Sequence, residues 1–434
     1  MSLPAIDELT APTQDEPRPS TAAGQARIAF FGIFGIQNLG NECTLQAILN
    51  NARKTLPDAD VRAISFDPAD TVRRHRLESV AVSQQNFSGV VKRGGLSGAL
   101  AKILRLCRRG PAELMDWISA VRALRGTDVV FMTGTGMLTD YATTAIGFPY
   151  HVFRWTAAAR LAKSKVRFVG VGVGPIYEKL SRRFIKTALS LADYISFRDQ
   201  NSQNRIRNIG FNSEKDHVFP DLAFSLPQDL FPKRSDRGPG PLEVGLGVMD
   251  HRDIHLWTDE QHSAQYSAYL EKMCDFVTWL VVHRYSVRIL QGDARHDTGT
   301  RAELKSKLEA RGIRYSEAGI IDEGSATVEE LINQIAQVDI VVSPRFHNLV
   351  LGLMMNIPAI SISYDPKNDC LLDEVGLGSY HQQLTELDVT KLTEQFLELE
   401  ARTGEVKPLI EKRTKEFREL LDEQYSLIFS NFKR

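Results

Sequence analysis

Residues 27–56 read RIAFFGIFGIQNLGNECTLQAILNNARKTL. The apolar run at 28–31, followed directly by glycines, is typical of a buried strand that ends in a tight turn. Leu45, Ile48 and Leu49 then recur at helical spacing. Strand, glycine turn and helix in this order predict the opening of an α/β domain.

The same pattern recurs along the chain. Short apolar runs that end in glycine or polar residues predict further strands at 128–134, 166–175, 193–199, 216–221, 242–250, 286–293, 339–344 and 357–365. Helical spacing predicts helices around 261–283 and 300–311 and from 346 onward. Uninterrupted apolar strands are typical of parallel sheets with helices on both faces, so we expect two doubly wound, Rossmann-like α/β domains that face a cleft.

Composition divides the chain into five parts. Residues 1–25 are polar and Pro-containing and predict a flexible leader. The first α/β domain is expected over 26–226, and a Pro- and Gly-rich linker over 227–242. The second domain, with the donor site, follows over 243–386, and residues 387–434 predict a charged helical tail.

The overall composition excludes several classes of protein. The 434 residues carry a net charge of −1, with 43% hydrophobic and 25% charged residues, unlike a disordered, collagen-like or nucleic-acid-binding chain. The cysteines, at 43, 107, 274 and 370, form no CxxC pair, so no disulfide framework or zinc ribbon is expected. Without an apolar run long enough to span a bilayer, the sequence predicts a cytoplasmic protein.

One region is strongly basic. Residues 73–125 contain 11 Lys and Arg against three Asp and Glu, and 92–110 (KRGGLSGALAKILRLCRRG) mixes these cations with Leu and Ile. This pattern fits a solvated helix face, or a helix that docks on an anionic membrane surface to reach a lipid-linked acceptor. The second interpretation would place the protein peripherally at the inner face of the membrane.

Two glycine loops follow predicted strands. In the first, Gly35 and Gly40 allow tight turns, and the amides that lead into a helix would suit an anion or a sugar hydroxyl. In the second, Gly134 and Gly136 lie at a strand end, where Asp140 would either bond a ligand or cap a helix. Glycines that merely form a turn explain the first loop equally well.

Three cations mark a candidate anion site. Arg198 follows a strand in SFRD, where its fork of donors matches a carboxylate or phosphate unless it merely pairs with Asp199 on the surface. Arg345 and His347 begin an apolar helix in SPRFHNLVLGLM, and Lys367 follows the next strand. A fixed cation and an imidazole at a helix N-terminus favour a phosphate-bearing ligand.

Other candidates are weaker. The histidines of HRDIH, 251–255, lack the Glu of HExxH and a third ligand, so no metal is predicted. Asp293 follows a strand and would bind a sugar or nucleotide hydroxyl or cap a helix.

From about residue 28 to 378 the motifs resemble polysaccharide pyruvyl transferases. The resemblance rests on GIFGxxNLGNE, GTG-x3-D, GVGVGP, DYISFRD, PD and above all SPRFHNLVLGLMMNIPAISISYDPK. Relatives often carry Gly-Asp where this chain has Gly40-Asn41, so Glu42 would have to supply any acid at that turn.

This resemblance implies a GT-B-like fold and phosphoenolpyruvate as co-substrate, with no other cofactor and no metal. It implies that pyruvate passes to a sugar hydroxyl pair as a cyclic ketal during cell-envelope or exopolysaccharide synthesis. Arg198 and Arg345 would clamp the donor with His347 and Lys367, and His347 would act as acid. Asp140 and Glu42 are weaker candidates for the base. The acceptor would be a sugar, a nucleotide sugar or a lipid-linked saccharide.

Two alternatives remain open. A GT-B glycosyltransferase that uses a nucleotide sugar would have the same fold. A sugar-binding relative without catalytic activity would keep the fold as well.

Overall fold

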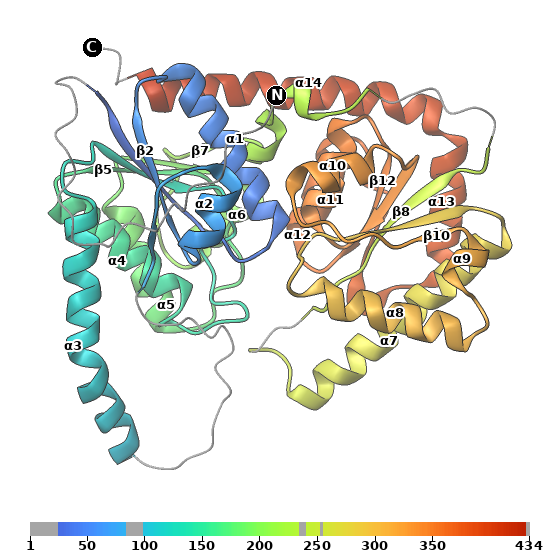
Figure 1. Cartoon of the computed structure of the whole chain (residues 1–434), viewed down its shortest axis with the longest axis horizontal. Coiled ribbons are helices and arrows are strands. Elements are labelled where there is room, and N and C mark those ends of the chain that lie inside the picture. Colours follow the sequence, from blue (N-terminus) through green and yellow to red (C-terminus); the bar gives the residue numbers. More distant parts are fainter. Residues whose placement is uncertain (1–24, 84–98, 234–239, 252–254, 431–434) are drawn as a thin grey trace, which may run out of the picture.

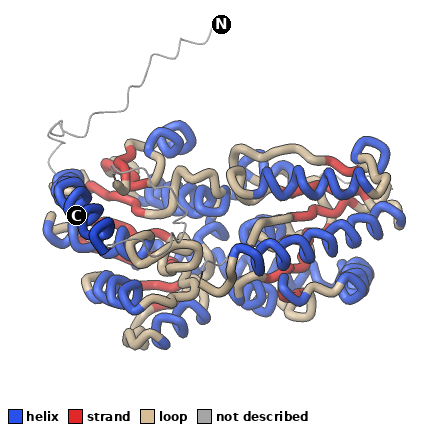
Figure 2. The backbone as a smooth tube through the Cα atoms, turned by 90° about the horizontal axis from the view of Figure 1, so that it is seen from below, coloured by secondary structure: helices blue, strands red, loops and turns tan. Residues whose placement is uncertain are grey.

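The computed structural model describes residues 25–83, 99–233, 240–251 and 255–430, with the backbone alone for 99–109. It forms two α/β bodies that lie side by side (Figure 1). In each body the strands are enclosed between layers of helices (Figure 2).

The first body contains a seven-stranded parallel sheet in the order β3-β2-β1-β4-β5-β6-β7. Its strands are β1 Arg27–Phe31, β2 Asp60–Ser65, β3 Ser79–Ala81, β4 Val129–Thr133, β5 Lys165–Val171, β6 Tyr194–Phe197 and β7 His217–Val218. Its helices are α1 Leu39–Thr55, α2 Pro68–His75, α3 Ala99–Ala123, α4 Phe148–Leu161, α5 Lys179–Ser190 and α6 Gln200–Asn208, followed by 3-10 turns η1 Leu222–Ser225 and η2 Gln228–Leu230. The strand order reverses between β1 and β4, as in doubly wound sheets.

The second body contains a six-stranded parallel sheet in the order β10-β9-β8-β11-β12-β13. Its strands are β8 Glu243–Gly247, β9 Ser286–Leu290, β10 Ile320–Ile321, β11 Ile340–Ser343, β12 Ala359–Ser363 and β13 His381–Gln383. Its helices are α7 Asp259–Val282, α8 Asp297–Ala310, α9 Tyr315–Ala318, α10 Val328–Ile335, α11 Phe346–Met354 and α12 Pro366–Glu374, with a 3-10 turn η3 Leu384–Glu386.

Apolar burial explains why the central strands form. Every residue of β4 and β12 is buried, because helices cover both faces of each sheet. The loops at the carboxyl ends of the two sheets meet each other: Leu39 N–H donates to Gly292 O at 3.0 Å, and Ala294 N–H donates to Gln37 O at 2.9 Å. The candidate ligand loops therefore converge between the bodies.

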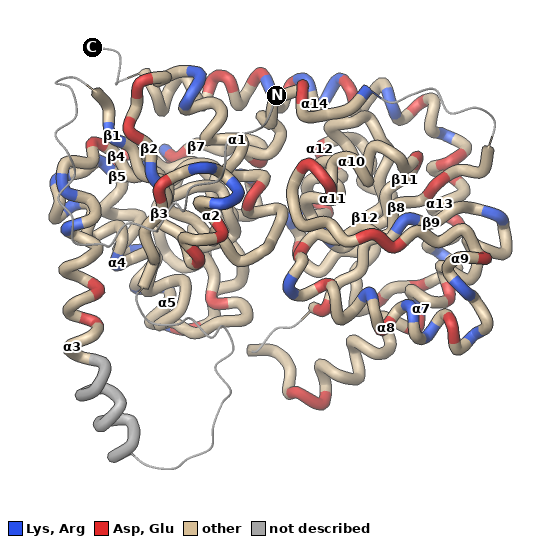
Figure 3. Tube along the Cα trace, in the orientation of Figure 1, with Lys and Arg blue, Asp and Glu red and all other residues tan. Residues whose placement is uncertain are grey.

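The C-terminal helices join the two bodies. Helix α13, Val389–Ala401, packs on α7, and α14, Thr403–Phe429, runs back along both bodies (Figure 1). At the C-terminal end of α14 the ring centres of Phe429 and Phe131 are 5.4 Å apart, and Gln424 Nε2 donates to Ser196 Oγ at 2.6 Å. Charged residues of both signs line α14 (Figure 3), and its apolar face is what holds it against the first sheet.

The basic region contains α3, which projects from the first body (Figure 1). Buried Arg154 of α4 anchors its second half through Glu113 at 2.9 Å and Asp116 at 3.1 Å. The side chains of 92–109, on which the membrane prediction depends, lie outside the described residues, as does the expected leader up to residue 24. A search of the described chain for a helix long and apolar enough to cross a bilayer finds none.

Candidate functional site

The predicted cations Arg198, His347 and Lys367 come together where the two bodies meet. Arg198 follows β6 of the first body, whereas His347 and Lys367 lie in the first turns of α11 and α12 of the second. All three lie near the ring of Phe346: its centre is 5.0 Å from Arg198 Cζ, 6.0 Å from Lys367 Nζ and 5.3 Å from the His347 ring centre. Asp221, which caps η1, completes the cluster. We call these five residues the donor cluster.

Two carboxylates hold Arg198, and the absence of a side chain at Gly172 leaves room for its guanidinium. Its Nε lies 3.2 Å from Asp199 Oδ2, and its Nη1 lies 3.6 Å from Asp221 Oδ2. A Cβ on Gly172 would stand 2.5 Å from Arg198 Cζ, so only glycine lets the guanidinium lie across the end of β5. Burial lowers the pKa of Arg198, but the charges of Asp199 and Asp221 outweigh burial and raise it above the ordinary value. Arg198 is therefore a permanent cation.

His347 lies against the first turn of α1 and faces Asp221. A Cβ on Gly40 would stand 2.1 Å from His347 Nδ1. Gly40 is thus a helical residue that permits close approach between the bodies, and the tight turn expected at this position is wrong. On the other side of the ring, Nε2 lies 3.7 Å from Asp221 Oδ1.

Asp221 is ionised in this setting. Burial raises the pKa of its carboxyl, but hydrogen bonding from His347 and the charges of His347 and Arg198 outweigh burial and hold the pKa below its usual range. The donor cluster therefore combines fixed cations with one fixed anion.

Lys367 is linked to both bodies. Its Nζ donates to the Tyr364 hydroxyl and lies 4.4 Å from the centre of that ring. The Lys367 amide donates to Asp365 Oδ1 at 3.1 Å, and Asp365 Oδ2 pairs with Arg205 of α6 at 3.0 Å. Burial raises the pKa of Asp365, but the charges of Lys367 and Arg205 outweigh burial and lower the pKa below its usual value. The ion pair between Asp365 and Arg205, which joins the two bodies, therefore stays ionised.

Arg345 pairs with the carboxylate of Asp297. Its Nε lies 3.2 Å from Asp297 Oδ2 and its Nη2 donates to Asp297 Oδ1, so one edge of the guanidinium fork is occupied. Of the three guanidinium nitrogens of Arg345, only Nη1 has no hydrogen-bond partner among the described residues. The prediction that Arg345 helps to clamp the donor remains a prediction; in this structure Asp297 fixes its guanidinium beside the cluster.

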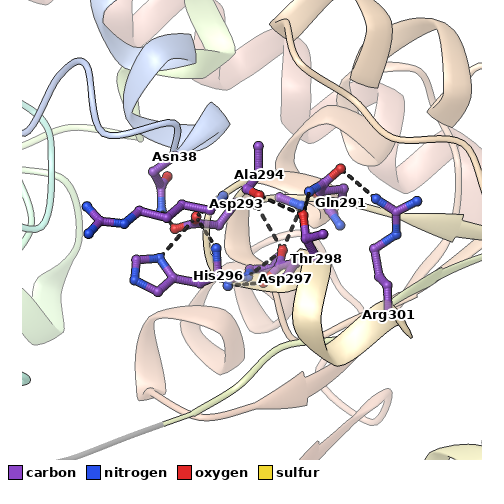
Figure 4. A network of polar contacts seen from close by, with 12 residues as sticks. Asn38, Gln291, Asp293, Ala294, His296, Asp297, Thr298 and Arg301 are labelled. Atoms are coloured by element: carbon purple, nitrogen blue, oxygen red, sulfur yellow. Dashed lines mark hydrogen bonds and ion pairs between the residues drawn. The ribbon is translucent and has the colours of Figure 1, made fainter. Parts of the chain in front are cut away.

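Asp293 belongs to the contact between the bodies. Its Oδ2 accepts from Asn38 Nδ2 at 3.0 Å, and its Oδ1 accepts from the amides of Arg295 and His296 at 3.1 and 3.0 Å. Figure 4 shows Asp293 between Asn38 and His296, next to Asp297. Asp293 therefore holds the turn that precedes α8 and the contact with Asn38, and the helix-cap alternative is wrong, because the N-cap position of α8 is His296.

Glu42 lies outside the donor cluster. Its Oε1 accepts from the Gly35 amide at 2.9 Å, and its Oε2 lies 2.7 Å from His75 Nε2. Gly35 has φ of 75°, and a Cβ there would stand 2.3 Å from the Asp67 carbonyl oxygen. Glu42 therefore fixes the loop after β1, and the structure does not place it where a base would act on the donor.

Asp140 also has structural partners. Its carboxylate accepts from the amides of Tyr177 and Glu178, both at 2.9 Å, and its carbonyl oxygen lies 2.9 Å from His255 Nε2. Ligand atoms of Asp140, Glu178 and His255 lie within 4.8 Å of one another, the geometry that a metal ion would need. The hydrogen bonds of Asp140 and His255 account for their positions without an ion, and residues 252–254 of the HRDIH motif lie outside the described chain.

The second glycine loop serves packing. A Cβ on Gly134 would stand 2.9 Å from the Gly170 carbonyl oxygen, so Gly134 lets β4 approach β5. A Cβ on Gly136 would meet no atom within 4 Å.

A cavity of about 20 Å³ lies beside the donor cluster, lined by Arg198, Asp221, Phe346 and Lys367 together with residues of η1, α12 and α14. This volume holds about one water molecule, so a larger anion needs more room than the cavity offers.

Sequence reasoning gave no site role to three contributors: Asp221, Gly172 and Phe346. The Pro-Asp pair at 220–221 after a strand was noticed as a motif, and the repeated glycines of 170–174 were the signal for Gly172. Phe346 has the sequence context of an apolar helix, and only the fold shows that its ring lies next to Arg198 and Lys367.

Two facing Rossmann-like bodies with a polar cluster at the strand ends define the GT-B-like class. Solved structures agree. The chain is similar to a putative UDP-N-acetylglucosamine 2-epimerase from Listeria monocytogenes, with 12% identity, TM-score 0.58 and coverage of 94% of this chain and 97% of that one. It is similar to Anabaena HepE in complex with UDP (11%, 0.55, 92% and 99%). It is also similar to Neisseria meningitidis UDP-GlcNAc 2-epimerase bound to UDP-GlcNAc (11%, 0.51, 92% and 100%). These likenesses establish the fold.

The family follows from the sequence. A family model described as Polysaccharide pyruvyl transferase matches residues 38–366, and the chain belongs to that family. It is therefore a transferase. No curated protein matches the sequence.

Proposed function

We propose that this enzyme transfers pyruvate from phosphoenolpyruvate to two hydroxyls of one sugar, which forms a cyclic ketal and releases phosphate. The observation that carries the proposal is the convergence of Arg198, His347 and Lys367 on the Phe346 ring from both bodies. Membership of the family supports the reaction class.

Charge and shape suit the donor. Phosphoenolpyruvate carries a phosphate and a carboxylate, and a guanidinium and an ammonium beside the same ring can bind one each. The N-termini of α11 and α12 add favourable dipoles at the same place. Arg345 contributes its remaining Nη1 and a fixed positive charge from beside the cluster.

The chemistry needs one proton at the right carbon. When the methylene carbon is protonated, the neighbouring carbon becomes electrophilic and the first hydroxyl attacks it. The second hydroxyl then displaces phosphate and closes the ring. His347 is the titratable group of the cluster that suits the proton transfer, and Arg198 and Lys367 would stabilise the departing phosphate.

The acceptor is proposed as a sugar, a nucleotide sugar or a lipid-linked saccharide of a cell-envelope polysaccharide or exopolysaccharide. For a lipid-linked acceptor we propose a cytoplasmic enzyme that works at the inner face of an anionic membrane, with the basic region 73–125 as the contact. Sedimentation with anionic vesicles tests this: loss of binding when Lys92, Arg93 and Lys102 become glutamine supports it, and unchanged binding contradicts it.

A second candidate is a glycosyltransferase that uses a nucleotide sugar. It is favoured by the fold alone, since neighbours of the same fold were solved with UDP or UDP-GlcNAc.

Release of inorganic phosphate from phosphoenolpyruvate separates the two candidates. We expect phosphate release that depends on a saccharide acceptor, at a rate lowered about 10²-fold or more in Lys367→Ala. Lys391→Ala, an exposed change on α13, is the matched control and should keep the rate. Release of a nucleoside diphosphate from a nucleotide sugar, with none of phosphate, would contradict the proposal.

A further inference from the structure

Two buried polar atoms on neighbouring side chains of the donor cluster have no hydrogen-bond partner among the described residues. They are Nε2 of His347 and Oδ2 of Asp221. The other Asp221 oxygen, Oδ1, lies 3.7 Å from His347 Nε2. This is longer than a direct hydrogen bond, and catalytic hydrogen bonds of free enzymes are often long until substrate binds.

Helix capping does not account for the whole of Asp221. Its Oδ1 accepts from the Ala223 amide at 2.9 Å, which needs one oxygen and no charge. Its Oδ2 lies 3.6 Å from Arg198, too far for a strong hydrogen bond. A buried carboxylate with an unbonded oxygen is costly unless a cation is paired with it. Asparagine or serine would cap η1 equally well, so the cap does not require a charge; the charge of Asp221 instead faces Arg198 at 3.6 Å and His347 at 3.7 Å.

We propose that Asp221 is the positioning residue for His347: it accepts the Nε2 proton and leaves Nδ1 as the atom that exchanges protons with the substrates. The side chain of His347 is 15% exposed although its Nε2 is buried, and Nδ1 lies on the side of the ring next to Gly40. The inference rests on the proposed function for its chemistry, but the pairing can be measured without any substrate.

Other charged groups around His347 are already paired. On its own helix Arg345 pairs with Asp297, and on α1 Glu42 pairs with His75. Burial raises the pKa of the Cys43 thiol on α1, so this group is neutral.

The remaining cations, Arg198 and Lys367, lie 5.0 and 6.0 Å from the centre of the Phe346 ring and contact Asp199 and Tyr364. Among the described residues, α10 and α14 included, Asp221 is the one carboxylate with an oxygen within 4.0 Å of a His347 ring nitrogen.

The proton steps then balance at one nitrogen. The Nδ1–H of the imidazolium gives its proton to the methylene carbon of phosphoenolpyruvate, where a C–H bond forms. As the first hydroxyl oxygen bonds to the neighbouring carbon, its proton passes to Nδ1. The second hydroxyl oxygen then bonds to the same carbon, the bond to the phosphate oxygen breaks, and the last proton leaves with phosphate. Asp221 stays ionised throughout and holds the charged ring in place.

The test follows the His347 ring by proton NMR as a function of pH in the full-length protein, without substrate. His347→Gln identifies its signal. In Asp221→Asn the cap persists, and the midpoint of the ring titration should move to lower pH by about one unit, because a carboxylate within 4–6 Å favours the charged ring. Asp221→Ser, which also caps well, repeats the test should the amide disturb the fold.

Asp369→Asn is the matched control. Asp369 Oδ1 lies 3.3 Å from His381 Nδ1, away from the donor cluster, so this change should move the His381 titration and leave that of His347 in place. In the kinetic assay, Asp221→Asn should lower kcat for phosphate release about 10²-fold without raising KM for phosphoenolpyruvate, since an anion is removed beside an anionic donor.

An unmoved His347 titration in both Asp221 variants, or a raised KM with unchanged kcat, would overturn the inference. The two proposals fail separately. A shifted titration in a protein that never releases phosphate keeps the pairing and removes the donor assignment. Phosphate release together with an unmoved titration keeps the donor assignment and removes the pairing of Asp221 with His347.

Discussion

Replacing Gly40 by alanine places a methyl group where the His347 ring lies. The added Cβ would stand 2.1 Å from Nδ1, and ordinary contact begins near 3.4 Å, so the ring must move by about 1.3 Å. A displacement of about 1 Å at a reacting group can lower a rate about 10²-fold. We therefore expect Gly40→Ala to reduce phosphate release from phosphoenolpyruvate by about two orders of magnitude.

The same change should leave the protein folded. Overpacking costs about 1–3 kcal/mol, and the better helix propensity of alanine in the first turn of α1 returns up to about 1 kcal/mol. The expected loss of about 0–2 kcal/mol can be measured by urea denaturation. Gly136→Ala is the control, because its Cβ meets no atom within 4 Å and its φ lies outside the left-handed region. Full turnover in a folded Gly40→Ala protein would refute the placement of His347 against α1.

Three further predictions follow from the contacts around the site. Gly172→Ala, whose Cβ would stand 2.5 Å from Arg198 Cζ, should abolish the rise in melting temperature that phosphoenolpyruvate gives, and an undiminished rise would show that Arg198 does not bind the donor. Glu42→Ala should cost about 3–5 kcal/mol in urea denaturation, because it leaves loop and histidine partners unpaired, whereas a stable protein with lost turnover would return Glu42 to the candidate bases. The folded-state pKa of Asp365 is lowered, so its contribution to stability is present above its unfolded value near 3.9 and is lost as pH falls through the folded value. Asp365→Asn should therefore flatten the loss of stability below about pH 4, and an unchanged slope would contradict the ion pair with Arg205.

The central strands of both sheets could be predicted because they are short apolar runs, buried on both faces. The strands β2, β3, β10 and β13 were not predicted. In β2 polar residues interrupt the run, and β3, β10 and β13 are edge strands of two or three residues whose pairing depends on neighbours far along the chain. The helical tail was predicted, but its return to the first body was not, since the contact of Phe429 with Phe131 leaves no local sequence signal.

The cations of the site could be predicted because Arg198, His347 and Lys367 each follow a strand end, where parallel sheets bind ligands. Their partners could not. Nothing near Arg345 in the sequence indicates its partner Asp297, which begins α8, the helix after β9. The role of Gly40 was misjudged for the same reason: the atom that requires glycine there is Nδ1 of a histidine 307 residues away in the chain, from 40 to 347.

Thermal unfolding of the wild-type protein with phosphoenolpyruvate, and separately with UDP-GlcNAc, tests the donor assignment most directly when it is repeated on Arg198→Gln. A donor at about 100 times its Kd stabilises the folded state by about 2.7 kcal/mol, which is visible as a raised Tm. We predict that phosphoenolpyruvate raises the Tm of the wild type and not that of Arg198→Gln. A rise with UDP-GlcNAc alone, or an equal rise with phosphoenolpyruvate in both proteins, would contradict the assignment.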